Sequence, residues 1–199
     1  TRDAIDASFR LGGCLAELHR WKDSATVFGQ LLTRKALTAG DRIEAYARKG
    51  LAHFRLDDHD QTRKTLIAAV AYARKVDGVE RLDNDFFLGM SYYYLAAIPH
   101  VHFRLSKVTT DKRMGKTLDA KAKLLLVSQR RYIETIRLKN PYWATAAGFQ
   151  IGSLYREFYN TLMTALPNFK RAAKKNAKKA KISVVKAERQ LVQVYLEEL

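Results

Sequence analysis

Few side chains in this sequence have the types and spacings that catalysis or metal binding requires. His100 and His102 are two positions apart, so on a helix they would face different directions, whereas metal-binding histidine pairs on helices are typically spaced i, i+4. The single cysteine, Cys14, follows Gly12 and Gly13 in an apolar helical stripe, and no catalytic Cys-His-Asn signature accompanies it. We therefore predict no metal site here and a buried, inert thiol.

The acidic residues and the loops give no stronger chemical signal. Asp57, Asp58 and Asp60 flank a turn, but they lack the spacing of a calcium-binding loop, so we expect capping and solvation from them. The sequence contains no glycine-rich phosphate loop and no serine elbow. We predict a protein that is not an enzyme and that uses no cofactor or small-molecule substrate. A catalytic site assembled from distant residues is the alternative that the sequence leaves open.

The composition is that of a helical globular protein. The chain has 199 residues, of which 47% are hydrophobic, and it contains only 10 Gly and 3 Pro. This is too apolar for a disordered chain and too poor in turn residues for an all-β protein. No uncharged apolar run approaches the roughly 18 residues that span a bilayer, and the first residues do not form a signal peptide. The lone cysteine excludes an internal disulfide and is weak evidence for a reducing compartment.

Positive charge is the extreme feature of the composition. Lys and Arg number 36 against 20 Asp and Glu, a net charge of +16, and the excess is concentrated in residues 101–140 and 168–189. Such a chain could bind nucleic acid, an anionic membrane or an acidic protein face. The second basic segment has no interleaved aromatic residues, so any nucleic-acid binding would be independent of sequence; the alternative is a solvated tail. The candidate polyanion contacts are Lys170, Arg171, Lys174, Lys175, Lys178, Lys179 and Lys181.

Apolar residues recur at spacings of three and four almost throughout, which predicts seven or eight helices in antiparallel pairs. We expect Asp41 and Asp60 to be N-caps, Pro99 to end or kink its helix, and residues 100–115 to form an insertion with a loop at 107–113. The expected helices begin with apolar stripes at 5–18 and 27–32 and continue at about 41–54, 61–76, 85–98, 117–138, 143–166 and 172–199.

Four glycines stand inside these helical stripes, where glycine costs about 1 kcal/mol relative to alanine. Each has a large apolar, aromatic or His residue three positions later, and the spacing from Gly12 to Ser24 equals that from Gly50 to Thr62, at twelve residues. A small residue on each helix of a pair lets the two helices approach closely. We therefore predict packing roles for Gly12, Ser24, Gly50, Thr62, Gly89 and Gly152. A non-repeating helical bundle with incidental glycines is the alternative.

On these residues the sequence resembles the tetratricopeptide repeat family from about Ile5 to Pro167. The match is degenerate, because Ser8, Tyr46, Asp85 and Gly148 occupy the position where the family has Trp. The resemblance implies antiparallel helix pairs stacked as a short α-solenoid over residues 1–167, followed by a basic C-terminal helix over 168–199.

The C-terminal part also resembles large tetratricopeptide proteins of myxobacteria and related bacteria with complex envelopes. The stretches that carry this resemblance are 140–143, 151–159, Pro167 and the Tyr-Leu-Glu-Glu-Leu sequence of 195–199. The resemblance implies an envelope-linked scaffold, and it favours the periplasm or cell envelope slightly over the cytoplasm.

In tetratricopeptide solenoids, the stripe on the glycine-bearing helices that faces the concave side binds ligands. Here that stripe is mostly apolar, so binding of a chaperone-type carboxylate tail is not expected. Either a partner helix covers the stripe, or a C-terminal or inserted helix fills it as core, with Ile182, Val185, Leu191 and Val194 as the docking residues. The candidate groove residues are Phe9, Leu51, Phe54, Phe86, Met90, Tyr93, Phe149 and Arg156.

The sequence thus predicts a non-enzymatic scaffold or adaptor that binds an acidic or amphipathic helix of another protein in a concave groove. The alternative is a basic module that binds nucleic acid or anionic membrane through its Lys-rich C-terminal segment.

Overall fold

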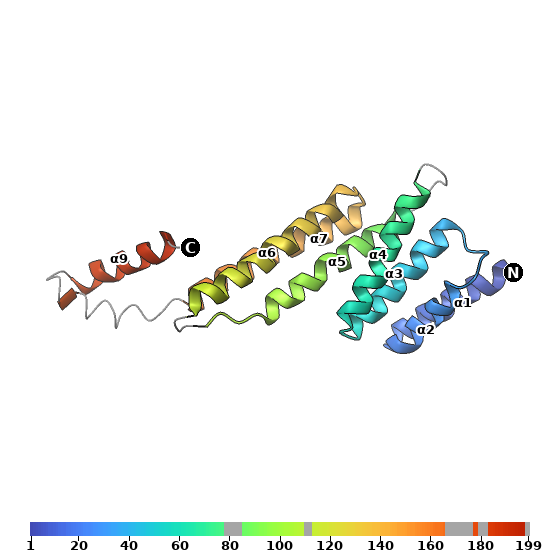
Figure 1. Cartoon of the computed structure of the whole chain (residues 1–199), viewed down its shortest axis with the longest axis horizontal. Coiled ribbons are helices and arrows are strands. Elements are labelled where there is room, and N and C mark those ends of the chain that lie inside the picture. The colour runs from blue at the N-terminus through green and yellow to red at the C-terminus, as the bar shows by residue number, and fades with distance from the viewer. Residues whose placement is uncertain (78–84, 110–112, 166–176, 179–182, 198–199) are drawn as a thin grey trace.

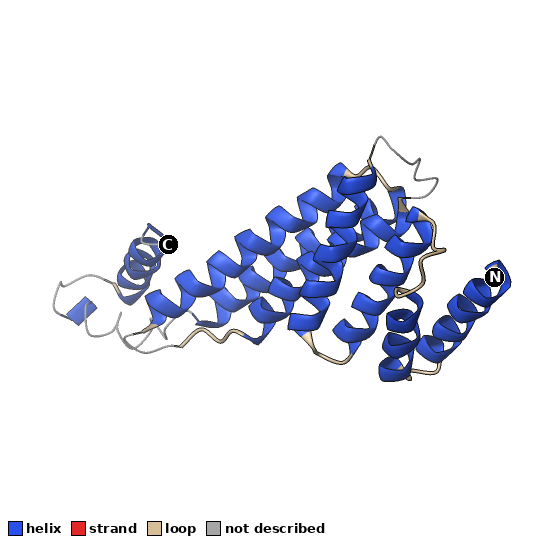
Figure 2. Ribbon diagram, turned by 45° about the vertical axis from the view of Figure 1, so that its right-hand side comes forward, coloured by secondary structure: helices blue, strands red, loops and turns tan. Residues whose placement is uncertain are grey.

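The computed structural model describes residues 1–77, 85–109, 113–165, 177–178 and 183–197. Within these ranges the chain is all-helical and no strand occurs, as the apolar periodicity predicted (Figure 2). The helices are α1 (Arg2–Glu17), α2 (Trp21–Leu31), α3 (Ala39–Arg55), α4 (His59–Val76), α5 (Phe86–Leu105), α6 (Met114–Arg137), α7 (Pro141–Ala165) and α9 (Val184–Glu197).

Consecutive helices from α1 to α7 pack against one another in chain order (Figure 1). In addition, α3 packs against α5, and α5 packs against α7. Among the described residues, α9 does not pack along any of the other helices, and Val185 on it is exposed. Val185 is the one predicted docking residue whose side chain the structure describes; the side chains of Ile182, Leu191 and Val194 lie outside what it describes, so docking of the C-terminal stripe and the division at residues 167 and 168 stay predictions. None of the described helices is both long and apolar enough to cross a membrane.

The helix caps differ from the predicted ones by a few residues. Thr38, not Asp41, is the N-cap of α3, and Asp41 completes the capping box by accepting from the Thr38 backbone N–H. Burial acts to raise the pKa of Asp41, but hydrogen bonds from Arg2 and Thr38 outweigh it and hold this pKa below its usual value. At α4 the N-cap is Asp58, whose carboxylate accepts from the Gln61 backbone, and not the predicted Asp60.

Three of the turns between helices contain a non-glycine residue in the left-handed region. These residues are His19 between α1 and α2 (φ 58°), Asp57 between α3 and α4 (φ 57°) and Lys139 between α6 and α7 (φ 60°). A side chain at such a φ costs roughly 1–2 kcal/mol. The tight turns that join these helix pairs therefore contain some backbone strain.

Two of the four helical glycines lie where the helices of a pair meet closely. A Cβ on Gly12 would come within 2.6 Å of the Phe28 ring, and one on Gly50 would overlap the Leu66 side chain. Ser24 is fully buried and its hydroxyl donates to the Gly12 carbonyl at 2.9 Å. These contacts join α1 to α2 and α3 to α4, in agreement with the twelve-residue spacing.

The other two glycines depart from the pattern. A Cβ on Gly89 would come within 2.6 Å of Trp143, so this glycine adjoins α7 and not the following helix, α6. Gly152 has nothing within 4 Å of its Cβ position, so its predicted packing role is wrong. The physical reason is that no described helix covers that face of α7.

Pro99 does not end its helix. The helix α5 continues through it to Leu105, because Ile98, Pro99, His100 and Phe103 are all buried, and this packing offsets the roughly 3 kcal/mol that an interior proline costs. Residues 100–115 are therefore not an insertion as predicted: they hold the end of α5 and the start of α6. Two features lengthen the interval from Gly89 to Gly152: the third pair has helices of 20 and 24 residues against 17 and 18 in the second pair, and Gly89 lies near the start of α5 whereas Gly152 lies near the middle of α7.

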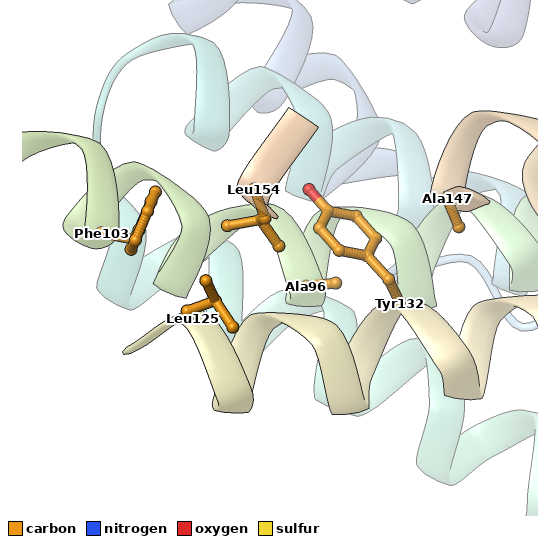
Figure 3. Close-up of a cluster of buried hydrophobic side chains, with 6 residues drawn as sticks. All are labelled: Ala96, Phe103, Leu125, Tyr132, Ala147 and Leu154. Carbon is orange, nitrogen blue, oxygen red and sulfur yellow. The ribbon is translucent and has the colours of Figure 1, made fainter. Parts of the chain in front are cut away.

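The largest of the buried apolar clusters lies where α5, α6 and α7 meet (Figure 3). The hydroxyl-bearing ring of Tyr132 lies among the apolar side chains there and is only 1% exposed. The members are Ala96, Phe103, Leu125, Tyr132, Ala147 and Leu154. This cluster fixes α7 against the rest of the molecule and so determines which face of α7 remains outside.

Candidate functional site

Most of the stripe predicted as a binding groove packs within the chain: Met90 is buried, and the half-buried members are Phe9, Leu51, Phe54, Phe86 and Tyr93. Met90 is 5% exposed and packs with Ala47 of α3 and Trp143 of α7. The Trp143 ring centroid lies 5.2 Å from that of Phe86 and 5.1 Å from that of Tyr93. The central part of the stripe is therefore covered by a helix of this chain and is not an open groove.

The outer members of the stripe are also packed within the chain. Leu51 packs against the cluster around Trp143, Phe54 lies 5.1 Å from Tyr94 between ring centroids, and Phe9 lies 6.1 Å from Phe28. The helices α3, α5 and α7 lie side by side, so each partly covers the stripe of its neighbour, and this face is less open than helix pairing alone predicts. Partner binding on its half-buried residues stays a prediction.

Two residues of the predicted groove do remain exposed, and both belong to α7. Phe149 is 67% exposed, and Arg156, seven residues later, is exposed as well. The same stripe carries three further large side chains, Tyr142 at 63%, Tyr159 at 59% and Met163 at 52%. Positions 142, 149, 156 and 163 repeat every seven residues, so these side chains follow one line along the helix. We call these five residues the α7 face.

The α7 face carries little charge for so basic a chain. Over its 25 residues α7 contains only two ionisable acids or bases of the Asp, Glu, Lys and Arg type, Arg156 and Glu157. Glu157 is engaged within the structure: it accepts from Arg104 at 2.9 Å and from Ser153 at 3.2 Å. Burial opposes ionisation, yet these hydrogen bonds lower the pKa of Glu157. Arg156 has no ion-pair partner among the described residues, so the α7 face presents one free positive charge among apolar side chains.

The surface of the α7 face is also shaped for close approach. Gly148 and Gly152 lie beside the stripe with nothing within 4 Å of their Cβ positions. Large side chains flanking small ones leave a depression into which another helix can pack. Fully exposing an apolar side chain of this size costs about 1.5–3 kcal/mol relative to burying it, so covering the α7 face would be favourable.

The α7 face is held by a well-anchored helix. On the opposite side, Trp143, Ala147 and Leu154 are buried. The Asn140 side chain accepts from the Trp143 backbone N–H at 3.1 Å and donates to Asp85 at 2.8 Å, which ties the start of α7 to the start of α5. The exposed side chains are therefore presented by a fixed backbone.

A buried polar network lies behind α7 and joins it to α5 and α6. His100 is 4% exposed, its Nδ1 lies 3.1 Å from the Tyr132 hydroxyl, and its Nε2 lies 3.9 Å from Glu157. Burial and the nearby Arg104 lower the pKa of His100 to about 4, so it is neutral at pH 7. Burial also raises the pKa of Tyr132. The network has the residue types of acid–base chemistry, but its geometry links three helices, and we assign it to structure.

The other predicted sites are the polyanion contacts, the cysteine and the possible metal ligands. Of the seven candidate polyanion contacts, Lys178 is exposed, and the other six lie outside the described residues. Cys14 is exposed, so the prediction of a buried thiol is wrong; it lies on the side of α1 away from α2, where Gly13 also has open space. In the part of the chain that the structure describes, no group of three or more His, Cys, Asp or Glu could hold a metal ion.

The sequence predicts Phe149 and Arg156 as groove residues, whereas Tyr142, Tyr159 and Met163 of the same surface were not predicted. The signal was present in the seven-residue spacing and in the near absence of charge from residues 141–165. Comparison of the chain with models of protein families, with curated proteins and with solved structures finds no match. The candidate function therefore depends on the geometry of this surface.

Proposed function

We propose that this protein is a non-enzymatic interaction module of the tetratricopeptide type, which binds an amphipathic helix of a partner protein on the α7 face. The observation that carries the proposal is the α7 face itself: four large apolar or aromatic side chains, each more than half exposed, around Arg156, which has no ion-pair partner among the described residues. Soluble proteins rarely expose a contiguous apolar patch of this kind without a binding role.

The packing order of the chain supports a helix as the occupant. The first helices of successive pairs lie side by side, with α3 against α5 and α5 against α7. Polar contacts between their first turns link α1 to α3 through Arg2 and Asp41, and α5 to α7 through Asp85 and Asn140. On this proposal the helices form a short α-solenoid, and the partner helix takes the place that the next first helix would hold beyond α7.

The dimensions and charge of the α7 face define the partner further. Tyr142 to Met163 is three seven-residue repeats, or about 31 Å at 1.5 Å per residue, so a helix of about 20 residues would cover it. Such a helix would place apolar residues at i, i+3 or i+4 and i+7 against the aromatic side chains. It would carry an acidic residue opposite Arg156, and the net charge of +16 would favour encounter with an acidic partner.

Site-specific photocrosslinking tests the proposal. A photoreactive phenylalanine analogue is placed at Phe149 or Tyr159 in the full chain, and at Leu11, a 53% exposed residue of α1, as the matched control. In the cells that make the protein, we expect positions 149 and 159, but not 11, to crosslink to one amphipathic, acidic helix of another protein. A synthetic peptide of that helix should then bind the purified chain, and Phe149→Asp should abolish this binding while Leu11→Asp leaves it intact.

Three outcomes would overturn the proposal. Crosslinks from 149 and 159 to residues 184–197 of the same molecule would show that the chain covers its own face. Crosslinks to a second copy would make the α7 face a self-association surface. Equal crosslinking from all three positions would mean that the α7 face has no preference for a partner.

A further inference from the structure

A pocket on the other half of the molecule has a different chemical character. It lies between α2, α3 and α4 and has a volume of about 310 Å³. No carboxylate is among the side chains that line it. Its lining residues are Lys22, Ala25, Thr26, Gly29, Lys49, His53, Leu56 and Gln61.

Two cations converge on this pocket. Both Lys22 and Lys49 line it, and neither has an ion-pair partner among the described residues. The Lys49 amine reaches across from α3 to α2, where a Cβ on Gly29 would lie 3.4 Å from its Nζ. Two unpaired ammonium groups in one concave site repel each other, and an anion between them would offset that repulsion.

The pocket also supplies neutral hydrogen-bond donors. His53 Nε2 is buried with no hydrogen-bond partner in the described residues, so the other ring nitrogen, Nδ1, is the one that can face a ligand in the pocket. Burial lowers the pKa of His53, and the charge of Lys49 lowers it further, while the charge of Asp58 opposes the shift. The ring is therefore neutral at pH 7 and can donate a hydrogen bond from one nitrogen. The Gln61 side-chain amide provides another donor. The Thr26 hydroxyl already donates to the Lys22 carbonyl at 2.9 Å, so we do not count it.

We propose that this pocket binds a phosphate monoester, with Lys22 and Lys49 pairing with the phosphate charge and with His53 and Gln61 donating hydrogen bonds to its oxygens. A tetrahedral dianion has more acceptor sites than a carboxylate, which matches two cations and two neutral donors. Ala25 and Leu56 line the remaining wall, where a small organic group would lie. The inference is independent of the α7 face and adds a ligand site to the other half of the chain.

Titration calorimetry on the full chain tests the inference, with O-phosphoserine as the probe, serine as its unphosphorylated counterpart and inorganic phosphate as the minimal anion. We expect saturable binding of O-phosphoserine and weaker binding of inorganic phosphate, with no binding of serine. Lys22→Gln and Lys49→Gln should each raise the Kd about tenfold or more, because each removes a charge-assisted hydrogen bond.

The controls separate this pocket from the general positive charge of the chain. Lys75→Gln, which lies at the far end of α4, about 21 Å along the helix axis from Gln61, and Lys178→Gln, in the basic C-terminal segment, remove the same charge elsewhere. Both should leave the Kd within about twofold, since exposed charges farther away than about 10 Å are largely screened at 0.1 M salt. Ring resonances of His53 should shift with O-phosphoserine and saturate at the same Kd.

Two results would overturn the inference. The first is the absence of O-phosphoserine binding below about 10 mM, a Kd that corresponds to only about 3 kcal/mol of binding free energy. The second is an equal loss of affinity in the Lys49 and Lys75 variants, which would show that net charge and not the pocket holds the anion. All four lysines are partly or fully exposed, so circular dichroism should confirm that every variant folds.

Discussion

Substituting alanine for Gly50 gives a sharp test of the close helix pairing in this fold. The new Cβ at position 50 would overlap Cδ2 of Leu66 and lie 2.6 Å from its Cγ, and Leu66 is fully buried, so its side chain has little room to move away. Overpacking of this kind costs about 1–3 kcal/mol, typically with backbone shifts. Alanine also gains about 1 kcal/mol over glycine inside a helix. We therefore expect a net loss of up to about 2 kcal/mol in the free energy of unfolding, and a larger loss for Gly50→Leu.

The chain offers matched controls for this substitution. Gly13 in α1 and Gly152 in α7 also lie inside helices, but nothing lies within 4 Å of their Cβ positions. There the propensity gain is unopposed, so Gly13→Ala and Gly152→Ala should each stabilise the protein by about 0.5–1 kcal/mol. The same chemical change should thus have opposite signs at different sites.

Urea denaturation followed by circular dichroism at 222 nm measures these differences. The double variant Gly50→Ala/Leu66→Ala should lose less stability than the sum of the two single variants, because the smaller side chain at position 66 vacates the space that the new methyl group needs. If Gly50→Ala is as stabilising as Gly13→Ala, then α3 and α4 are not in the contact that the structure shows, and the packing account of the repeat glycines is refuted.

Two further predictions concern the buried histidine and the tight turns. The pKa of His100 is about 6.5 in the unfolded chain and about 4 in the folded one, so on acidification the unfolded chain binds a proton at this histidine first. The stability that the neutral His100 contributes is therefore fully present above pH 6.5 and is lost as the pH falls towards 4. Denaturation at pH 7 and pH 4 should show that the wild type loses about 2 kcal/mol more than His100→Gln over this interval, and an identical pH dependence of the two proteins would contradict the assignment. At the turn between α6 and α7, where Lys139 has a φ of 60°, Lys139→Gly should be about 1 kcal/mol more stable than Lys139→Ala in thermal or urea melts, and equal stabilities would show that no backbone strain resides there.

The helices could be predicted from the sequence because apolar periodicity reports burial directly. The pairing of α1 with α2 and of α3 with α4 was also predictable, since Gly12 and Gly50 stand at a fixed distance from Ser24 and Thr62. The prediction that Pro99 ends its helix was wrong. The energetic cost of a proline inside a helix is local, whereas the burial that stabilises the rest of α5 comes from contacts with α6 and α7, which are distant in sequence. The longer third pair, together with the positions of Gly89 and Gly152 in their helices, accounts for the interval that was predicted to hold an insertion.

The candidate surface was predictable only in part. An apolar stripe indicates that another element packs on it, but the stripe does not identify that element; this holds for Leu51, Met90 and Tyr93. That element is α7, and its buried Trp143 fills the place that was assigned to a partner. The exposed stripe on α7 has the same residue types as the covered ones, so only the structure distinguishes the two.

The placement of the two tryptophans gives each half of the molecule its own optical signal. Trp143 is 6% exposed and is surrounded by the rings of Phe86, Tyr93, Tyr94 and Tyr142, whereas Trp21 is more exposed and lies near the Arg55 guanidinium. The emission of Trp143 therefore reports on the seam between α5 and α7, with tyrosines close enough to transfer excitation to it, while Trp21 reports on the first helices. A Trp21→Phe variant retains a single tryptophan, behind the α7 face, so its tryptophan emission follows binding at that face alone, and the difference from the wild type isolates the signal of the first helices.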